Sequence, residues 1–239
     1  MICNRLNPGW EIIYQRAHAL LAAKLLEPMG DKADPRWFET LNAVSQHDHG
    51  WQEWQSLTAL NPEGEPRNFL DTPPEESEEQ ARRAVDCALH QSLWGGLLVA
   101  RHVHTLYRKN KEESLRRLLT ELEAARTEWR AILGIDLQQE KESYQFLNWA
   151  DTLSLLLCLQ PNERLGPVHP HLHGQSYTLK GKGSTRYLTP WPYSQDELTL
   201  SVEARHLERE RFGSEKELAE ALGASKIVTK QWVLLPYNG

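Results

Sequence analysis

Apolar residues recur at helical spacing over most of residues 15–160. The first such segment runs from Gln15 to about Pro28. The second begins at Asp34-Pro35, an N-cap followed by proline at the first helical position, and ends near Gly50. Each segment presents an apolar stripe on one face, which predicts two amphipathic helices that pack on a common core.

Three further helices are predicted after an irregular connection. Residues 52–75 contain several prolines and glycines, which is typical of a long loop, and loops of this length are often functional. An acidic turn at residues 75–79 then opens a predicted long helix that reaches Tyr107, with a weak point at Gly95-Gly96. Apolar spacing predicts two more helices, over residues 115–134 and 147–158.

The two ends of the chain carry strand patterns instead. Residues 1–14 place Asn-Pro-Gly between two short apolar runs, which predicts a hairpin. Residues 161–192 are rich in proline, glycine and histidine, and residues 197–207 alternate as a strand does. A short helix over 214–222 and a final apolar strand over 231–235 follow.

Together these segments predict a single domain over residues 1–239 that is mainly α, and α+β overall. Its core is a helical bundle over about residues 15–160. A small antiparallel sheet is formed jointly by the terminal elements, residues 1–14 and 175–239.

Composition and charge narrow the class of protein. A hydrophobic content of 40% is enough for a sizeable core, and the formal charge of -6 argues against a surface that coats nucleic acid. Cys3, Cys87 and Cys158 are far apart and show no CxxC spacing, which favours a reducing compartment. The start of the chain lacks a signal-peptide pattern, and the longest apolar run, residues 153–159, is too short to span a membrane. We therefore expect a cytoplasmic protein with neither a membrane nor a nucleic-acid partner.

The most distinctive chemistry lies in histidines and aspartates on the predicted helices. His18 lies within the first helix, His47-Asp48 ends the second, and Asp151 lies in the apolar part of the fifth. A buried ionised carboxylate is costly unless a cation, an arginine or strong donors compensate it. Imidazole and carboxylate ligands suit Fe, Mn, Co, Ni or Zn. The four residues therefore predict a site for a divalent transition metal.

Polar packing without a metal is the alternative for the same residues. His18 and Asp151 can form a buried pair with each other or with Asn148 and Ser154. His47-Asp48 can instead cap the end of its helix. Both members of an adjacent pair can ligate only where the backbone leaves the regular helix, because successive helical side chains diverge by about 100°.

Two residues of the long predicted helix are further candidates for the site. His90 and His102 lie about 18 Å apart on a regular helix, so both cannot bind one centre without a sharp break. His102 follows the apolar run 97–100 and is the histidine assigned to the site, whereas His90 and His104 are assigned to the surface or rim. Arg101 offers a planar donor fork for a phosphate, and a solvated surface arginine is the equal alternative.

Other motifs in the sequence give weaker evidence for a functional site. The alternating histidines of residues 169–173 are interpreted as an exposed polar loop, with adventitious binding of a transition metal as the alternative. The chain has no GxSxG, P-loop or GxGxxG motif, so catalysis by a serine elbow and nucleotide binding by those loops lack support.

Two resemblances extend this interpretation. The order His18, His47-Asp48, Asp151 on successive helices resembles the H...HD...D pattern of the HD superfamily of metal-dependent phosphohydrolases. The segments QRAHALLAAKL, QHDHGW, LLVARH, WADTLSLLLC and TPWPY resemble an uncharacterised bacterial domain-of-unknown-function family (3891) over nearly the whole chain. The second resemblance is the closer one and implies no established activity.

The HD resemblance implies an HD-like helical bundle that binds one metal ion through four ligands, with Asp48 able to bridge to a second ion. The four ligands are His18, His47, Asp48 and Asp151.

The same resemblance implies a metal-dependent hydrolase of a small-molecule phosphoester. On this hypothesis metal-bound water attacks phosphorus. From their positions in this sequence, we expect Arg101 or His102 to offset charge on the phosphoryl oxygens, and Trp51 and Trp54, just past the HD pair, to line the cleft. One alternative is a diiron oxygenase of the HD type, which needs extra histidine ligands that only His102 supplies. The other is a non-catalytic helical binding protein with a relic metal site.

Overall fold

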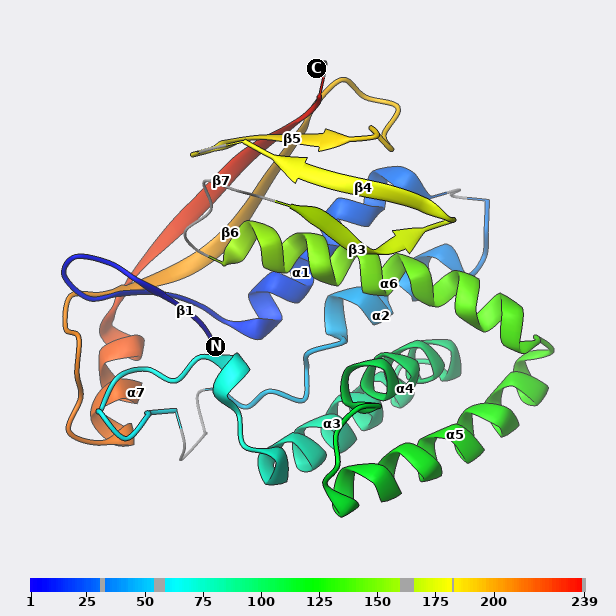
Figure 1. Cartoon of the computed structure of the whole chain (residues 1–239), viewed down its shortest axis with the longest axis horizontal. Helices are drawn as coiled ribbons and strands as arrows, with labels where there is room; N and C mark the ends of the chain where they lie inside the picture. Colours follow the sequence, from blue (N-terminus) through cyan, green and yellow to red (C-terminus); the bar gives the residue numbers. More distant parts are fainter. Residues whose placement is uncertain (31–32, 54–58, 160–165, 182, 238–239) are drawn as a thin grey trace.

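The computed structural model of the protein describes residues 1–30, 33–53, 59–159, 166–181 and 183–237. In this part of the chain, helices and a large sheet lie side by side (Figure 1). The helices are α1 (Gln15–Leu26), α2 (Trp37–Gln46), α3 (Pro74–Leu89), α4 (Leu93–Tyr107), α5 (Glu113–Leu133), α6 (Leu137–Cys158) and α7 (Glu215–Ala224), with short 3-10 turns η1 (Glu27–Met29) and η2 (Phe69–Asp71).

Within the described ranges, the sheet has seven strands in the order β1-β2-β6-β7-β5-β4-β3. The parallel pair is β5 with β7, and the other neighbouring strands are antiparallel. The strands are β1 (Ile2–Arg5), β2 (Trp10–Ile13), β3 (Pro167–Leu172), β4 (Gln175–Lys180), β5 (Thr185–Thr189), β6 (Leu198–Leu207) and β7 (Lys226–Pro236).

The prediction of a mainly helical, HD-like bundle with a small antiparallel sheet is therefore wrong. The sheet is large and mixed, because residues 167–189 form three strands where the sequence suggested a region rich in proline, glycine and histidine. Within these strands, alternate side chains such as Tyr177, Leu179 and Leu188 are buried. The strand β7 also begins at Lys226, five residues before the apolar stretch that predicted it, because its first half pairs with β6 through largely exposed residues.

The long helix predicted up to Tyr107 is two helices. α3 ends at Leu89, and α4 begins at Leu93 after Ser92, whose side-chain oxygen accepts a hydrogen bond from the Gly95 backbone N–H at 3.0 Å. The break therefore lies at an N-cap serine, and Gly95-Gly96 lies inside the regular part of α4. The terminal hairpin, α5, β6 and α7 agree with their predicted positions.

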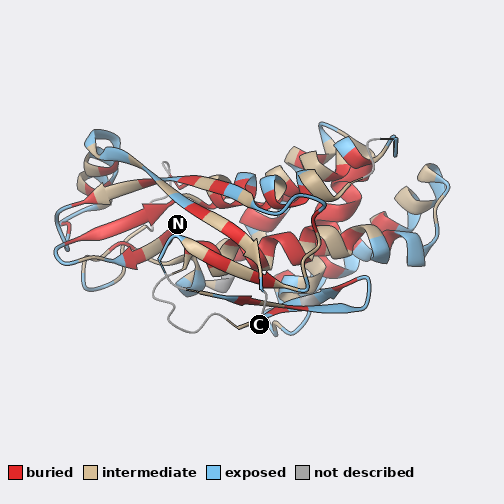
Figure 2. Cartoon of the chain, turned by 90° about the horizontal axis from the view of Figure 1, so that it is seen from above, coloured by how far each residue is buried: buried red, intermediate tan, exposed pale blue. Residues whose placement is uncertain are grey.

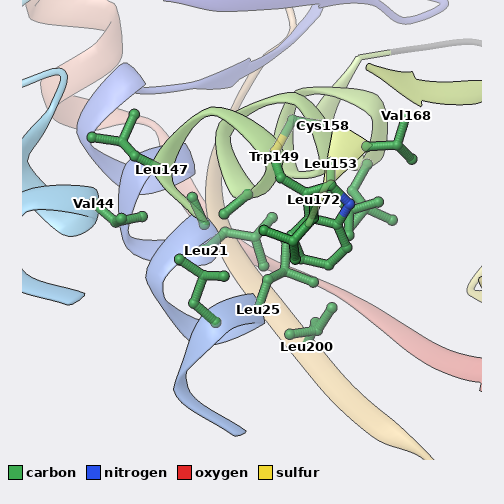
Figure 3. Packing of buried hydrophobic residues seen from close by; sticks show 14 of the residues in the cluster. Leu21, Leu25, Val44, Leu147, Trp149, Leu153, Cys158, Val168, Leu172 and Leu200 are labelled. Carbon is green, nitrogen blue, oxygen red and sulfur yellow. The ribbon is translucent and has the colours of Figure 1, made fainter. Parts of the chain in front are cut away.

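The main apolar core lies between the sheet and the helices. Figure 3 shows Leu21 and Leu25 of α1, Leu147 and Leu153 of α6 and Leu200 of β6 packed together. α1 packs on β6, and α6 packs on β3, so these two helices lie between the sheet and the remaining helices α2 to α5. Figure 2 shows that the buried residues follow this interior on both the sheet and the helices. The arrangement brings α1, α2, α4 and α6 together around one point.

Candidate metal centre

Five buried side chains from four helices converge between α1, α2, α4 and α6. α1 supplies His18, the end of α2 supplies His47 and Asp48, α4 supplies His102, and α6 supplies Asp151. Each of these residues, taken as a whole, is less than one-tenth exposed. They form two potential ligand triads that share His47, with the ligand atoms of each triad within 4.8 Å of one another. The structure therefore brings together all four residues predicted as metal ligands, and His102 with them.

The adjacent His47 and Asp48 can face the same point because α2 has already ended. Gln46 is the last residue of α2, and His47 is its C-cap. Just beyond, Gly50 passes so close to α3 that a Cβ there would lie 2.0 Å from the carbonyl oxygen of Gln80. A side chain at residue 50 would push this turn away from α3. The glycine thus holds the turn in place, and the pair lies off the regular helix as the sequence required.

The separations between ligand atoms suit a single ion. His18 Nε2 lies 2.8 Å from Asp48 Oδ2, and His47 Nε2 lies 3.4 Å from both Asp48 Oδ2 and Asp151 Oδ1. Ligands bonded at about 2.1 Å lie about 3.0 Å apart in an octahedron and about 3.4 Å apart in a tetrahedron. His102 Nε2 lies farther out, 3.9 Å from Asp151 Oδ2.

His47 has one ring nitrogen that is hydrogen-bonded and one that is not. Its Nδ1–H donates to the backbone carbonyl of Val44 at 2.7 Å, so in the neutral imidazole the lone pair is on Nε2. That Nε2 is buried and has no hydrogen-bond partner among the described residues. A buried acceptor that faces two carboxylates needs a cation, either a proton or a metal ion. The residues present therefore fit a metal ion.

His18 is oriented by a chain of hydrogen bonds. Ser154 Oγ donates to the Asp151 carbonyl at 2.9 Å, so its lone pair accepts from His18 Nδ1–H at 2.7 Å. His18 Nε2 then faces Asp48 Oδ2, and a proton on Nε2 or a metal ion bound by both atoms satisfies that contact. The other oxygen of Asp48 accepts from Trp51 Nε1–H at 3.2 Å. Such outer contacts are typical of metal ligands.

We expect Ser154→Ala to weaken metal binding by about 10- to 100-fold, because His18 loses the partner that fixes its ring and tautomer. Isothermal titration calorimetry on stripped protein measures the change. Thr152→Ala is the matched control, since Thr152 Oγ1 donates to the Asn148 carbonyl of its own helix at 2.9 Å and not to any of the five residues. Equal metal affinity of the two variants would contradict the assigned orientation of His18.

Burial and neighbouring charges set the protonation states of the candidate metal ligands. Burial would raise the pKa of the Asp48 carboxyl, but the charge of His47 and the hydrogen bond of His18 lower this pKa below its usual range. The pKa of Asp151 is also lowered, mainly by His47, against the effect of burial. Burial would lower the pKa of His47, yet Asp48 and Asp151 raise it to about 9. The group thus contains two ionised carboxylates.

His102 is the neutral member of the group. Burial lowers the pKa of its imidazole to about 4. Its Nδ1 lies 3.2 Å from the Tyr144 hydroxyl, and its ring stacks edge-on to His47. A neutral imidazole suits a metal ligand better than it suits the charge-neutralising role predicted from the sequence.

Arg101 lies in a different cluster. Its Nη1 donates to the fully buried Glu140 at 3.0 Å, and its guanidinium lies over the ring of Tyr144. Arg126 and Arg130 bind the same carboxylate. Arg101 does not line the cavity beside the histidines and aspartates. Its position therefore gives no support to the predicted contact with a phosphate.

A cavity of about 380 Å³ opens onto the group. His18, Asp48, His102 and Asp151 line it, together with residues of η2 and the outer ends of α3 and α4. Trp51 lies in its wall as predicted, whereas Trp54 falls outside the described residues. The sequence predicts only that the long connection over residues 52–75 is functional. It does not predict which residues of this connection line the cavity.

The alternating histidines of residues 169–173 are exposed, as predicted, but they lie on β3 and its turn. His171 Nε2 contacts Ser176 Oγ at 3.1 Å, and His173 stacks edge-on to Phe146. His90 is also exposed at the end of α3, in agreement with its predicted place on the surface.

No helix in the described ranges combines the length and apolar content that crossing a bilayer requires. Comparison with curated proteins and with solved structures finds no match to the chain. A family described as "Protein of unknown function (DUF3891)" matches residues 1–209, which is most of the chain and includes all five residues of the candidate centre. The chain therefore belongs to this family of proteins of unknown function.

Proposed function

We propose that the protein is a metal-dependent hydrolase of a small-molecule phosphoester. The observation that carries the proposal is the buried Nε2 of His47, which has no hydrogen-bond partner among the described residues and lies 3.4 Å from two ionised carboxylates. The order His18, His47-Asp48, Asp151 supports it, because this is the ligand order of the HD phosphohydrolases that the sequence resembles. The resemblance is one of ligand order, since the mixed sheet departs from the expected helical fold.

The metal ligands of this proposal are His18, His47, Asp48 and Asp151, with His102 as a fifth. The nitrogen and oxygen donors suit Fe, Mn, Co, Ni or Zn, as one or two ions. Such an ion supplies a bound water of lowered pKa and withdraws charge from phosphoryl oxygens. In the net reaction, the water oxygen bonds to phosphorus, the P–O bond to the alcohol breaks, and the alcohol leaves with a proton.

The surrounding residues prepare the site for this chemistry. Trp51 holds one oxygen of Asp48 and leaves the other facing His18 and His47. Gln15 lines the cavity, and its buried Oε1 has no partner in the part of the chain that the structure describes. This oxygen is an acceptor for a hydroxyl or water in the cavity.

An iron-dependent oxygenase is the second candidate, and His102 is the observation that favours it. Oxygenases of the HD type need histidines beyond the H...HD...D set, and His102 Nε2 lies 3.9 Å from Asp151. Iron content together with uptake of dioxygen distinguishes this activity from hydrolysis.

The test uses tag-free protein that is stripped with a chelator and reloaded with Fe, Mn, Co, Ni or Zn, one at a time. We expect at least one metal to give hydrolysis of p-nitrophenyl phosphate or bis(p-nitrophenyl) phosphate, and His47→Ala to lower the rate by more than about 100-fold. The stripped wild type is the control. Metal-loaded protein that hydrolyses neither ester but consumes dioxygen would replace the hydrolase by the oxygenase. A stable protein that binds no metal would leave a non-catalytic binding protein.

A further inference from the structure

Two exposed apolar side chains line the cavity beside the candidate centre. Leu70 of η2 is 69% exposed, and Leu106 of α4 is 55% exposed. Both line the same cavity as His18, Asp48 and Asp151. Exposed leucines that converge on a concave site mark a surface for an apolar group of a ligand, whereas scattered ones need no explanation.

The rest of the cavity wall is also poor in charge. Phe69 and Leu155 add apolar surface, and Gln15, Thr72 and Asn110 are neutral polar residues. Of the described residues that line this cavity, none is a lysine or an arginine. Among the described residues of its wall, the only carboxylates are those of the proposed ligands Asp48 and Asp151.

This charge pattern limits the substrate. When one divalent ion is bound, the two carboxylates balance its charge, so the cavity retains little positive charge for further anionic groups. Sites that hold several phosphates use arginine, lysine or additional cations for them. A nucleoside polyphosphate would find no such partner in the described wall. An alkyl or aryl group would instead cover the exposed leucines.

We propose that the substrate of this site is a monoanionic or neutral ester of an apolar alcohol, whose alkyl or aryl group packs on Leu70 and Leu106. The proposal rests on the proposed hydrolase function. The hydrolysed ester group lies toward the histidines and aspartates, and the apolar group lies toward η2 and the end of α4.

The test measures binding of n-alkylphosphonates from methyl to octyl, which cannot be hydrolysed at the P–C bond, to metal-loaded protein by calorimetry. Each methylene that becomes fully buried strengthens binding by up to about fourfold. We expect hexylphosphonate to bind at least about tenfold more tightly than methylphosphonate. The Leu70→Ser/Leu106→Ser double variant should lose most of this gain. Ile132→Ser is the matched control, because Ile132 is also 69% exposed but lies on α5 away from the cavity.

A second series separates this inference from the proposed function. n-Alkanols are titrated into stripped protein, where the cavity binds the probe without a metal. A lack of chain-length dependence in both series, or adenosine monophosphate binding more tightly than hexylphosphonate, would overturn the inference. Chain-length dependence with alkanols in a protein that binds no metal would support the apolar site and overturn the hydrolase. Metal content is measured separately on the double variant, which keeps all five candidate ligands.

Discussion

Asp151→Asn is expected to leave the protein folded and to remove its bound metal. The carboxylate oxygen Oδ1 lies 3.4 Å from His47 Nε2 and 3.6 Å from His18 Nε2, at the middle of the candidate centre. Asparagine keeps the shape of the side chain but lacks its negative charge. Loss of an outer contact alone weakens metal binding by about 10- to 100-fold, so loss of this ligand should weaken it by more than about 100-fold. Inductively coupled plasma mass spectrometry on tag-free protein measures the metal content.

The matched control for this variant is Asp86→Asn. Asp86 lies on α3, and its side chain is 71% exposed, so its charge should not affect the centre. Circular dichroism and gel filtration check that both variants fold. A near-stoichiometric metal content in Asp151→Asn would show that Asp151 is not a ligand. In that case the buried carboxylate of Asp151 in the wild-type protein would serve only as an ion-pair partner of His47.

The candidate centre could be predicted because its chemistry is local to each helix. An aspartate in the apolar part of α6 and a histidine on the buried face of α1 are costly unless they meet partners. The helical period shows that both face the interior. The prediction that they lie beside His47 and Asp48 rests on the resemblance to the HD phosphohydrolases, because spacing along a chain does not give the distance between helices. The orientation of Arg101 was missed because its partner Glu140 lies 39 residues away.

The size of the sheet could not be predicted from the same kind of evidence. Strands β3 to β5 are short, and proline, glycine and alternating histidines interrupt the apolar pattern around β3. β5 pairs in parallel with β7, and each paired residue of β7 lies 48 residues after its partner, so no local turn signals the pairing. Helix patterns that repeat over many residues are easier to identify, so the sequence predicts α5 and residues 147–158 of α6, although α6 begins ten residues earlier, at Leu137, and the sheet is larger than predicted.

Glu140→Leu is expected to lower the free energy of unfolding by about 3–5 kcal/mol, the range found when one partner of a buried ion pair is removed. Glu140 is fully buried and accepts hydrogen bonds from Arg126 at 2.7 Å, from Arg101 at 3.0 Å and from Arg130. Leucine would leave Arg126, only 2% exposed, without this carboxylate. Urea unfolding followed by circular dichroism measures the change.

The control is Glu121→Leu, which breaks an ion pair of similar length at the surface. Glu121 accepts from Arg82 at 2.8 Å, but the two side chains are 49% and 44% exposed, so the loss should stay below about 1 kcal/mol. Glu140→Gln should lower the free energy of unfolding by an amount between those of Glu140→Leu and Glu121→Leu. Its amide oxygen still accepts a hydrogen bond, but the negative charge is lost. The cluster joins α4 and α6, which carry His102 and Asp151, yet no residue of it lines the cavity. Folded Glu140→Gln should therefore keep its metal, and a variant that loses stability and metal together would show that the cluster also positions the centre.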